Sequence, residues 1–204
     1  MKAERRSGEE GARKREVILD ATEALMVDEG YSAVTSRRVA EKAGLKSQLV
    51  HYYFATMDDL FVALYERSEK VFLERHLQAV GSDNPLRALW DLCLHPQRTR
   101  LAQEFIAMSN RRKSISKISA RVMERMHAVN VVFIAKYLQE AGLDPDDYPP
   151  LVVSHIINGL SRSLVNEEAV GVTGGHDEVL AFVSRFLDDL EEKREARRAA
   201  VVVS

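Results

Sequence analysis

The chain has 204 residues, of which 46% are hydrophobic and 29% are charged, and its formal net charge is −2. This composition supports a packed core and argues against global disorder. The near-neutral balance excludes a protein that binds polyanions through bulk charge. No apolar run approaches the ~20 residues that span a membrane. The N-terminus has no apolar signal region either, so we expect a cytoplasmic protein without a membrane partner.

The chain begins with a basic segment. Residues 1–15 hold six Lys/Arg against three Glu, which is a local balance of +3. We expect residues 1–14 to form a flexible basic tail, and a solubilising arm or a DNA-tracking arm would both have this composition.

Residues 35–54 predict two short helices around a glycine turn. Thr35 or Ser36 can cap the first helix, and Gly44 can end it in the left-handed conformation. Ser47 is a plausible cap for the second helix, whose inward face is formed by Val50 and Phe54 at i and i+4. The remaining side chains of the second helix are polar and mostly share the other face: Lys46, Ser47, Gln48, His51 and Tyr52. Such a face suits a DNA major groove, although a helical hairpin with a solvated face is the alternative.

Residues 13–66 resemble the TetR family of transcriptional repressors. The resemblance is carried by spaced elements in the family's order: Arg15 to Gly30, Tyr31 to Thr35, Val39 to Gly44, Leu49 to Phe54, and Asp58 to Leu60. It implies an all-α fold with an N-terminal three-helix helix-turn-helix DNA-binding domain over 15–57. An effector-binding and dimerisation domain would follow over 58–192, and a C-terminal tail over 193–204.

The resemblance also implies roles in DNA binding. The expected contacts are Thr35, Ser36, Arg37, Lys46, Ser47, Gln48, His51, Tyr52 and Tyr53. Arg37 and Gln48 should carry most base discrimination, because both side chains can bond a base edge bidentately. The family usually has a lysine where this chain has Met57, which removes one phosphate anchor unless backbone amides replace it.

Further helices are predicted by the 3.6-residue period and by the Pro and Gly breaks. They cover residues 58–80, 85–95, 98–110, 122–142, 151–165 and 179–190. Pro85 should occupy a first helical turn, with Asn84 as its cap. No alternating strand pattern competes with the helices.

The last two helices carry more apolar surface than two surface helices of a monomer need. By resemblance they would pair with their twins in a homodimer, and burial within one subunit is the alternative. The expected interface residues are His155, Ile156, Gly159, Leu160, Ser163, Val179, Phe182 and Phe186. A two-fold dimer would place two recognition helices in major grooves of a palindromic double-stranded operator.

By resemblance, the second domain should also hold a small-molecule effector. The candidate lining is Trp90, Phe105, Met108, Met123, Met126, His127, Asn130, Phe133 and Asn158. The Met and aromatic residues fit an ordinary core as well, whereas buried His and Asn side chains need partners that a ligand could supply. Residues 98–126 hold eight Lys/Arg against two Glu. This excess fits a solvated loop, or an anionic effector such as an acyl-CoA-type molecule.

No catalytic constellation competes with the regulator hypothesis. The six histidines include no His-x-x-x-His pair, and Cys93 is the single cysteine. No phosphate loop or nucleophile elbow is present. We therefore expect no enzyme activity, no metal and no cofactor. Two non-enzymatic alternatives stay open, namely an architectural DNA-binding protein without an effector and a helical adaptor that no longer binds DNA.

Overall fold

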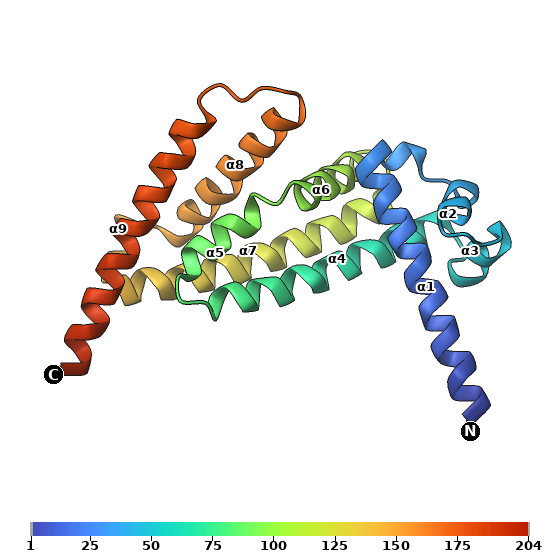
Figure 1. Ribbon diagram of the computed structural model, residues 1–204, viewed down its shortest axis with the longest axis horizontal. Coiled ribbons are helices and arrows are strands. Elements are labelled where there is room, and N and C mark those ends of the chain that lie inside the picture. The colour runs from blue at the N-terminus through green and yellow to red at the C-terminus, as the bar shows by residue number, and fades with distance from the viewer. Residues whose placement is uncertain (1, 204) are drawn as a thin grey trace. The chain divides into compact units, whose positions relative to one another are not determined.

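The computed structural model describes the backbone of residues 2–203 and the side chains of residues 9–200. Within these residues the chain is all-α, as predicted, and no strand is present (Figure 1). The helices are α1 (Lys2–Glu29), the 3-10 helix η1 (Tyr31–Ala33), α2 (Ser36–Lys42), α3 (Ser47–Tyr53), α4 (Met57–Val80), α5 (Pro85–Cys93), α6 (Pro96–Ser109), α7 (Lys113–Ala141), α8 (Pro150–Ala169) and α9 (His176–Val203). None of these helices combines the length and apolarity needed to cross a bilayer.

The chain divides into two compact units. Unit 1 comprises Met1–Val71 and Arg100–Arg121, and unit 2 comprises Phe72–Thr99 and Val122–Ser204. This division differs from the expected domain boundary at residue 57, because the first turns of α4 and most of α6 belong to unit 1. The physical reason is burial, since Leu60 and Leu64 of α4 are fully buried. The functional boundary therefore stays a prediction.

The core of unit 1 draws on every helix of the predicted helix-turn-helix. Ile18 of α1, Val39 of α2, Val50 of α3 and Leu60 of α4 are each at most 1% exposed. Burial of a branched side chain of this size stabilises the fold by roughly 1.5–3 kcal/mol. The apolar face predicted for α2 and α3 therefore points into a core, and it leaves the opposite face of α3 for other contacts.

Both terminal helices extend into segments that we expected to be tails. Helix α1 begins at Lys2 and α9 continues to Val203. Lys, Arg and Glu are good helix formers, and i,i+4 pairs such as Glu10–Lys14 (2.7 Å) and Asp189–Lys193 (2.6 Å) support the two helices. Met1 and Ser204, and the side chains of residues 2–8 and 201–203, lie outside the described part of these segments.

The core of unit 2 is formed by four helices. Its buried residues are Leu86, Leu89, Trp90 and Cys93 of α5, Phe133, Ile134, Tyr137 and Leu138 of α7, Ile157 and Leu164 of α8, and Val183, Leu187 and Leu190 of α9. Helix α5 starts as predicted, with Pro85 in its first turn and the Asn84 side chain accepting a 3.1 Å hydrogen bond from the Arg87 amide. Because α8 and α9 share this core, they lie side by side (Figure 1).

A buried polar network ties α9 to α7 within unit 2. The Tyr137 hydroxyl donates to Glu191 (2.7 Å), and Arg194 donates to Glu191 (2.9 Å) and to Glu140 (3.2 Å). Arg194 is only 4% exposed, and two carboxylates compensate its charge. Burial, with the Glu191 carboxylate beside it, raises the pKa of the Tyr137 hydroxyl, so this group stays a hydrogen-bond donor at neutral pH.

Candidate nucleic-acid interface and ligand cleft

The turn between α2 and α3 is built largely as the sequence predicts. The Thr35 side chain caps α2 by accepting a 3.3 Å hydrogen bond from the Arg38 amide. Gly44 has φ 65°, the left-handed conformation that a side chain would strain. The predicted cap of α3 is wrong, because Ser47 is the first helical residue and Lys46 occupies the cap position without a side-chain bond.

The outward face of α3 is polar and accessible. Lys46, Ser47, Gln48, His51 and Tyr52 are all exposed, and Tyr52 reaches 78% exposure. Arg37 of α2 is exposed as well. The side chains of Arg37, Lys46 and Gln48 form no hydrogen bond or ion pair with any residue whose side chain is described. Their donors are therefore available to an external partner.

Tyr53 is placed differently from its neighbour Tyr52. It is half-buried, its ring lies 5.1 Å from the Tyr52 ring, and the two rings are nearly perpendicular. Its hydroxyl lies 3.7 Å from where a Cβ would sit on Gly11 of α1. Tyr53 thus contacts α1, and its predicted role at DNA stays a prediction. Thr35 is exposed and Ser36 is half-buried at the start of α2.

Two of the four basic side chains in this region are paired with acids of α1. Arg38 donates to both carboxylate oxygens of Glu29 (2.6 and 2.7 Å), and Lys42 donates to Asp28 (3.3 Å). These pairs are exposed and contribute little stability, but they neutralise the two cations. Among the described side chains, the cations of this region without an acidic partner are therefore Arg37 and Lys46.

The start of α4 differs from the expected phosphate anchor. Met57 is half-buried at the first position, where a family member usually has a lysine. The Thr56 amide donates to Asp59 (2.9 Å) and the Asp59 amide donates to Thr56 (3.1 Å), which is a reciprocal capping arrangement. Asp58 pairs with Arg112. The amides of Thr56 and Asp59 are therefore already hydrogen-bonded, and the carboxylates of Asp58 and Asp59 lie in the same first turn.

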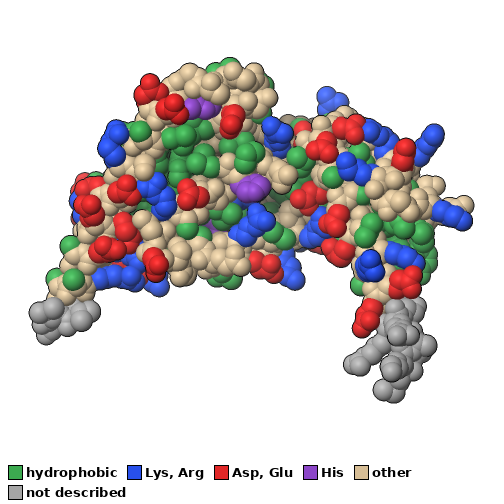
Figure 2. Space-filling view, viewed as in Figure 1, with side chains coloured by type: hydrophobic (Ala, Val, Ile, Leu, Met, Phe, Trp, Pro, Cys, Tyr) green, Lys and Arg blue, Asp and Glu red, His purple; other side chains and the backbone are tan. Residues whose placement is uncertain are grey.

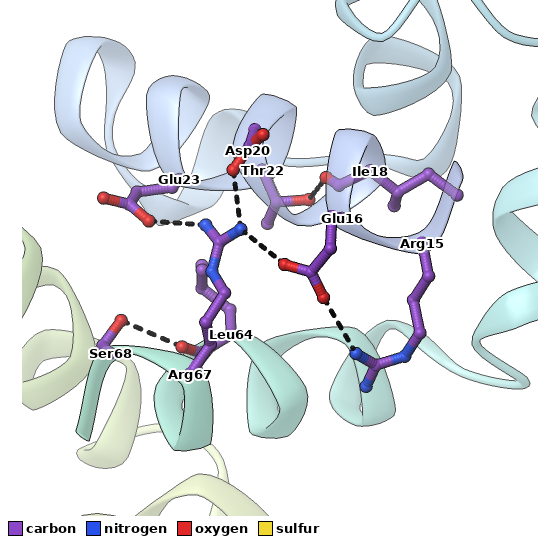
Figure 3. Close-up of polar contacts among 9 residues, drawn as sticks. All are labelled: Arg15, Glu16, Ile18, Asp20, Thr22, Glu23, Leu64, Arg67 and Ser68. Carbon is purple, nitrogen blue, oxygen red and sulfur yellow. Dashed lines mark hydrogen bonds and ion pairs between the residues drawn. The ribbon is translucent and has the colours of Figure 1, made fainter. Parts of the chain in front are cut away.

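Arg67 links α4 to α1 within unit 1 (Figure 3). Its guanidinium donates to Glu16 (3.3 Å), Asp20 (2.6 Å) and Glu23 (2.6 Å), three acids on one face of α1. The Arg67 side chain is 19% exposed, whereas its partners are 53%, 71% and 42% exposed. One cation therefore fixes the face of α1 that α4 contacts.

Unit 2 contains a cleft of about 370 Å³, a size suited to a small molecule. It is lined by His127 of α7 and by one stripe of α8: Ser154, His155, Asn158, Gly159, Arg162, Ser163 and Asn166. The imidazole rings of His127 and His155 are 5.1 Å apart. The Asn158 amide donates to the Ser154 carbonyl (2.7 Å), which fixes its orientation. No Asp or Glu is among the lining residues.

The nine predicted effector residues do not gather at one place. His127 and Asn158 line the cleft. Trp90, Phe133 and Asn130 are buried in unit 2, where Met126 is half-buried and Met123 is 39% exposed. Phe105 and Met108 belong to the core of unit 1, where Phe105 stacks on Tyr65.

Ser154, Arg162 and Asn166 line the cleft although we did not expect them at a ligand site. The available signal was their spacing, because these polar residues recur at helical intervals in an otherwise apolar stretch and so share one face of α8. Three residues expected at a dimer interface, His155, Gly159 and Ser163, also line the cleft.

The other expected interface residues lie on an apolar surface of α8 and α9. Ile156, Phe182 and Phe186 are 60%, 63% and 39% exposed, and Leu160 and Val179 are half-buried. Figure 2 shows apolar side chains gathered over these two helices. Large exposed apolar areas usually mark an interaction surface.

The chain combines a helix-turn-helix, whose second helix presents an accessible polar face, with a ligand-sized cleft in unit 2. This combination is typical of a DNA-binding regulator. Known proteins agree with this class. Residues 18–64 match the profile of bacterial regulatory proteins of the tetR family. The HTH-type transcriptional regulator AcrR of Shigella flexneri is 28% identical over 102 residues, which are 49% of this chain and 47% of that protein.

Two further proteins are similar to this chain. An uncharacterized HTH-type transcriptional regulator in the dhlA 5' region of Xanthobacter autotrophicus is 34% identical over 93 residues, 46% of this chain and 43% of that one. The chain thus matches about half the length of these curated relatives. A crystal structure of a transcriptional regulator of Saccharomonospora viridis in complex with choline has a TM-score of 0.65 and 16% identity, covers 91% of this chain and 95% of that one, and shares the fold.

Residues 18–64 thus match the TetR family, and together these comparisons support a TetR family transcriptional regulator. Proteins of this family are DNA-binding transcription factors rather than enzymes.

Proposed function

We propose that the chain is a sequence-specific, homodimeric repressor that a small-molecule effector releases from a palindromic operator. The observation that carries the proposal is the exposed face of α3, where Lys46 and Gln48 stand with Arg37 of α2 and form no bond to a described side chain. A helix of this kind enters a major groove, while basic side chains neutralise phosphates. Access to an operator also requires the cytoplasmic location that the sequence predicts.

Homodimer formation is supported by the apolar surface of α8 and α9. Phe182 and Ile156 are each at least 60% exposed, which costs free energy unless another surface covers them. A second copy of the chain would cover them and would give the two-fold symmetry that a palindrome matches.

Effector release follows from a two-state equilibrium. An effector bound in unit 2 favours a state in which the two recognition helices no longer match the operator spacing, and the operator is released. Helix α4 is the expected lever, because it contributes residues to both units. The choline complex of the Saccharomonospora viridis protein supports ligand binding in this fold.

The alternative is a helical DNA-binding or adaptor protein without an effector response, and one observation favours the adaptor. The start of α4 has Met57 in place of a basic residue, and Asp58 and Asp59 lie in its first turn. This arrangement weakens attraction to phosphate at that point.

The test is binding of the purified protein to DNA from upstream of its own gene, against scrambled DNA, across a salt series. Arg37→Ala and Gln48→Ala should each cost about 1–3 kcal/mol of operator binding. Lys46→Ala should weaken binding to all sequences and reduce the salt slope by about 1. Lys136→Ala, which removes a 71% exposed cation of α7 in unit 2, is the matched control and should leave binding unchanged.

Each other outcome points to one alternative. Equal binding to scrambled DNA would identify an architectural protein. A folded dimer that binds neither DNA, and that enriches no sequence from a random pool, would identify an adaptor. A sequence enriched from the pool would instead locate a remote operator.

A further inference from the structure

Arg98, at the start of α6, is a poorly solvated cation without a countercharge. It lies in unit 2, its guanidinium stacks over the Phe72 ring at 3.9 Å, and it donates to the Leu92 carbonyl (3.0 Å). No carboxylate among the described side chains pairs with it. Burial lowers the pKa of Arg98 to about 10. Removing a charge from water is costly unless an opposite charge compensates it.

Two neighbouring side chains have unused hydrogen-bonding atoms. His76 and Asn130 are 1% and 3% exposed and lie next to each other, but neither ring nitrogen of His76 nor the side-chain oxygen of Asn130 makes a hydrogen bond of normal distance and angle in the described part of the chain. Buried polar groups are normally satisfied. Burial, and next the charge of Arg98, lower the pKa of His76 to about 4, so its ring is neutral at neutral pH. It therefore offers one donor and one acceptor.

Cys93 connects this cluster to the cleft. Its thiol donates to the Asn158 side-chain oxygen (3.7 Å), and Asn158 lines the cleft. Burial raises the pKa of the Cys93 thiol, while the positive charges of Arg98 and Arg162 act against that rise. Arg98 approaches Cys93 through its bond to the carbonyl of the preceding Leu92, and Arg162 lines the same cleft as Asn158, the partner of the thiol. Arg162 is exposed in the cleft lining and has no ion-pair partner among the described side chains.

We propose that unit 2 binds a small organic acid whose carboxylate is recognised by Arg98 and Arg162, with the cleft as its entrance. A carboxylate would supply the missing countercharge, the N–H of the neutral His76 ring would donate to one of its oxygens, and the Asn130 side-chain oxygen would accept from a neighbouring hydroxyl. A singly charged carboxylate suits the site better than a phosphate, because a dianion loses more hydration beside Phe72. The inference rests on the proposed function, since this acid would be the effector.

The first experiment measures the thermal unfolding midpoint of the full chain with acetate, benzoate and octanoate at matched ionic strength. Each acid is compared with its own amide, and inorganic phosphate and choline are added separately. At a hundredfold excess over Kd, the bound acid should raise the midpoint by roughly 5–10 °C. The amides and choline should give no comparable shift, because they carry no negative charge. Inorganic phosphate should give a smaller shift than the acids, because much of it is a dianion that loses more hydration at this site.

Substitutions then locate the site. Arg98→Met removes the charge at similar volume and should abolish the shift while leaving the midpoint of the free protein unchanged or higher, because an uncompensated cation has gone. Arg100→Met, an exposed position two residues further along α6, is the matched control and should keep the full shift. Should Arg98→Met not fold, Arg162→Met at an exposed site should weaken acid binding at least tenfold.

The inference is overturned if no acid in the panel stabilises the protein more than its amide. It is equally overturned if both arginine variants keep the full shift, or if choline replaces the acids as the stabilising ligand. Operator binding in the same samples separates this failure from that of the proposed function. If a neutral or cationic compound releases the operator, only the proposal of an acid ligand fails. If an acid binds but the protein recognises no operator, only the proposal of a repressor fails.

Discussion

Arg67 on α4 donates a 2.6 Å hydrogen bond to Asp20 on α1, and the same guanidinium reaches Glu23 at 2.6 Å. One planar group thereby satisfies acids on successive turns of α1, an arrangement that the single charge of a lysine cannot reproduce. Both helices contribute these residues to unit 1, and the contact holds α1 against α4 (Figure 3).

Arg67→Ala should lower the free energy of unfolding by about 1–2 kcal/mol, since the pairs form a network although the carboxylates are partly solvated. Arg67→Lys should recover less than half of this loss. Urea unfolding measures both values. Arg121→Ala is the control, because its pair with Glu66 spans 3.4 Å between side chains that are 56% and 55% exposed, and its loss should be within about 0.5 kcal/mol. Equal losses for Arg67→Ala and Arg121→Ala would contradict the network.

Asp58 should make the stability of unit 1 depend on acid pH. A hydrogen bond from Ser114, and next the Arg112 guanidinium, lower the pKa of Asp58 below its ordinary 3.8. The unfolded state therefore binds the proton first, and the stabilisation is complete above about pH 4 and lost as pH falls below it. Asp58→Asn should cost about 1 kcal/mol at pH 6 and almost nothing at pH 3. Urea unfolding at both values checks this, and a constant difference would exclude a charge effect.

His76 should act in a different pH window. Its pKa is lowered from 6.5 to about 4, mainly by burial, so the unfolded state gains a proton near pH 6.5 while the folded ring stays neutral. Stability should thus fall between about pH 6.5 and pH 4, by about 3 kcal/mol in total. His76→Leu removes this component and should flatten the profile of unfolding free energy against pH. Parallel profiles for the variant and the parent protein would show that His76 is not responsible.

Phe182→Glu should convert the proposed dimer to a monomer. Phe182 is 63% exposed on α9, so a carboxylate there costs little in an isolated chain but would be buried against a second copy. Light scattering coupled to size exclusion measures the mass, and operator affinity should fall in parallel. Leu77→Glu on α4, where Leu77 is 71% exposed, is the control for adding a charge at an exposed apolar site. A Phe182→Glu dimer with unchanged mass would place the interface elsewhere.

The sequence predicts the helices well where local signals decide them. Thr35, Gly44 and Asn84 act through bonds or dihedral angles within a few residues, so their roles as cap or turn are readable from the chain and are confirmed. Ser47 was misplaced by one residue because neighbouring polar residues compete for a cap position.

The tertiary contacts could not be read in this way. Arg67 meets Asp20 across 47 positions, and Cys93 meets Asn158 across 65, and no local periodicity encodes such pairs. Phe105 was expected in the ligand pocket because of its residue type alone. An aromatic side chain at helical spacing fits any core equally well, and Phe105 lies in the core of unit 1. His127 and Asn158 do line the cleft. Their signal in the sequence is that a polar side chain within an apolar helix needs a hydrogen-bond partner.

The buried thiol of Cys93 has a practical consequence. It is the single cysteine of the chain, it is 8% exposed, and burial raises its pKa, so alkylating reagents should modify the folded protein slowly. Any motion that separates α5 from α8 would expose the sulfur atom. The rate of alkylation would then depend on how often this local opening occurs. The alkylation rate of Cys93 therefore measures the opening of unit 2 without an engineered label, and it can be compared with and without a bound ligand.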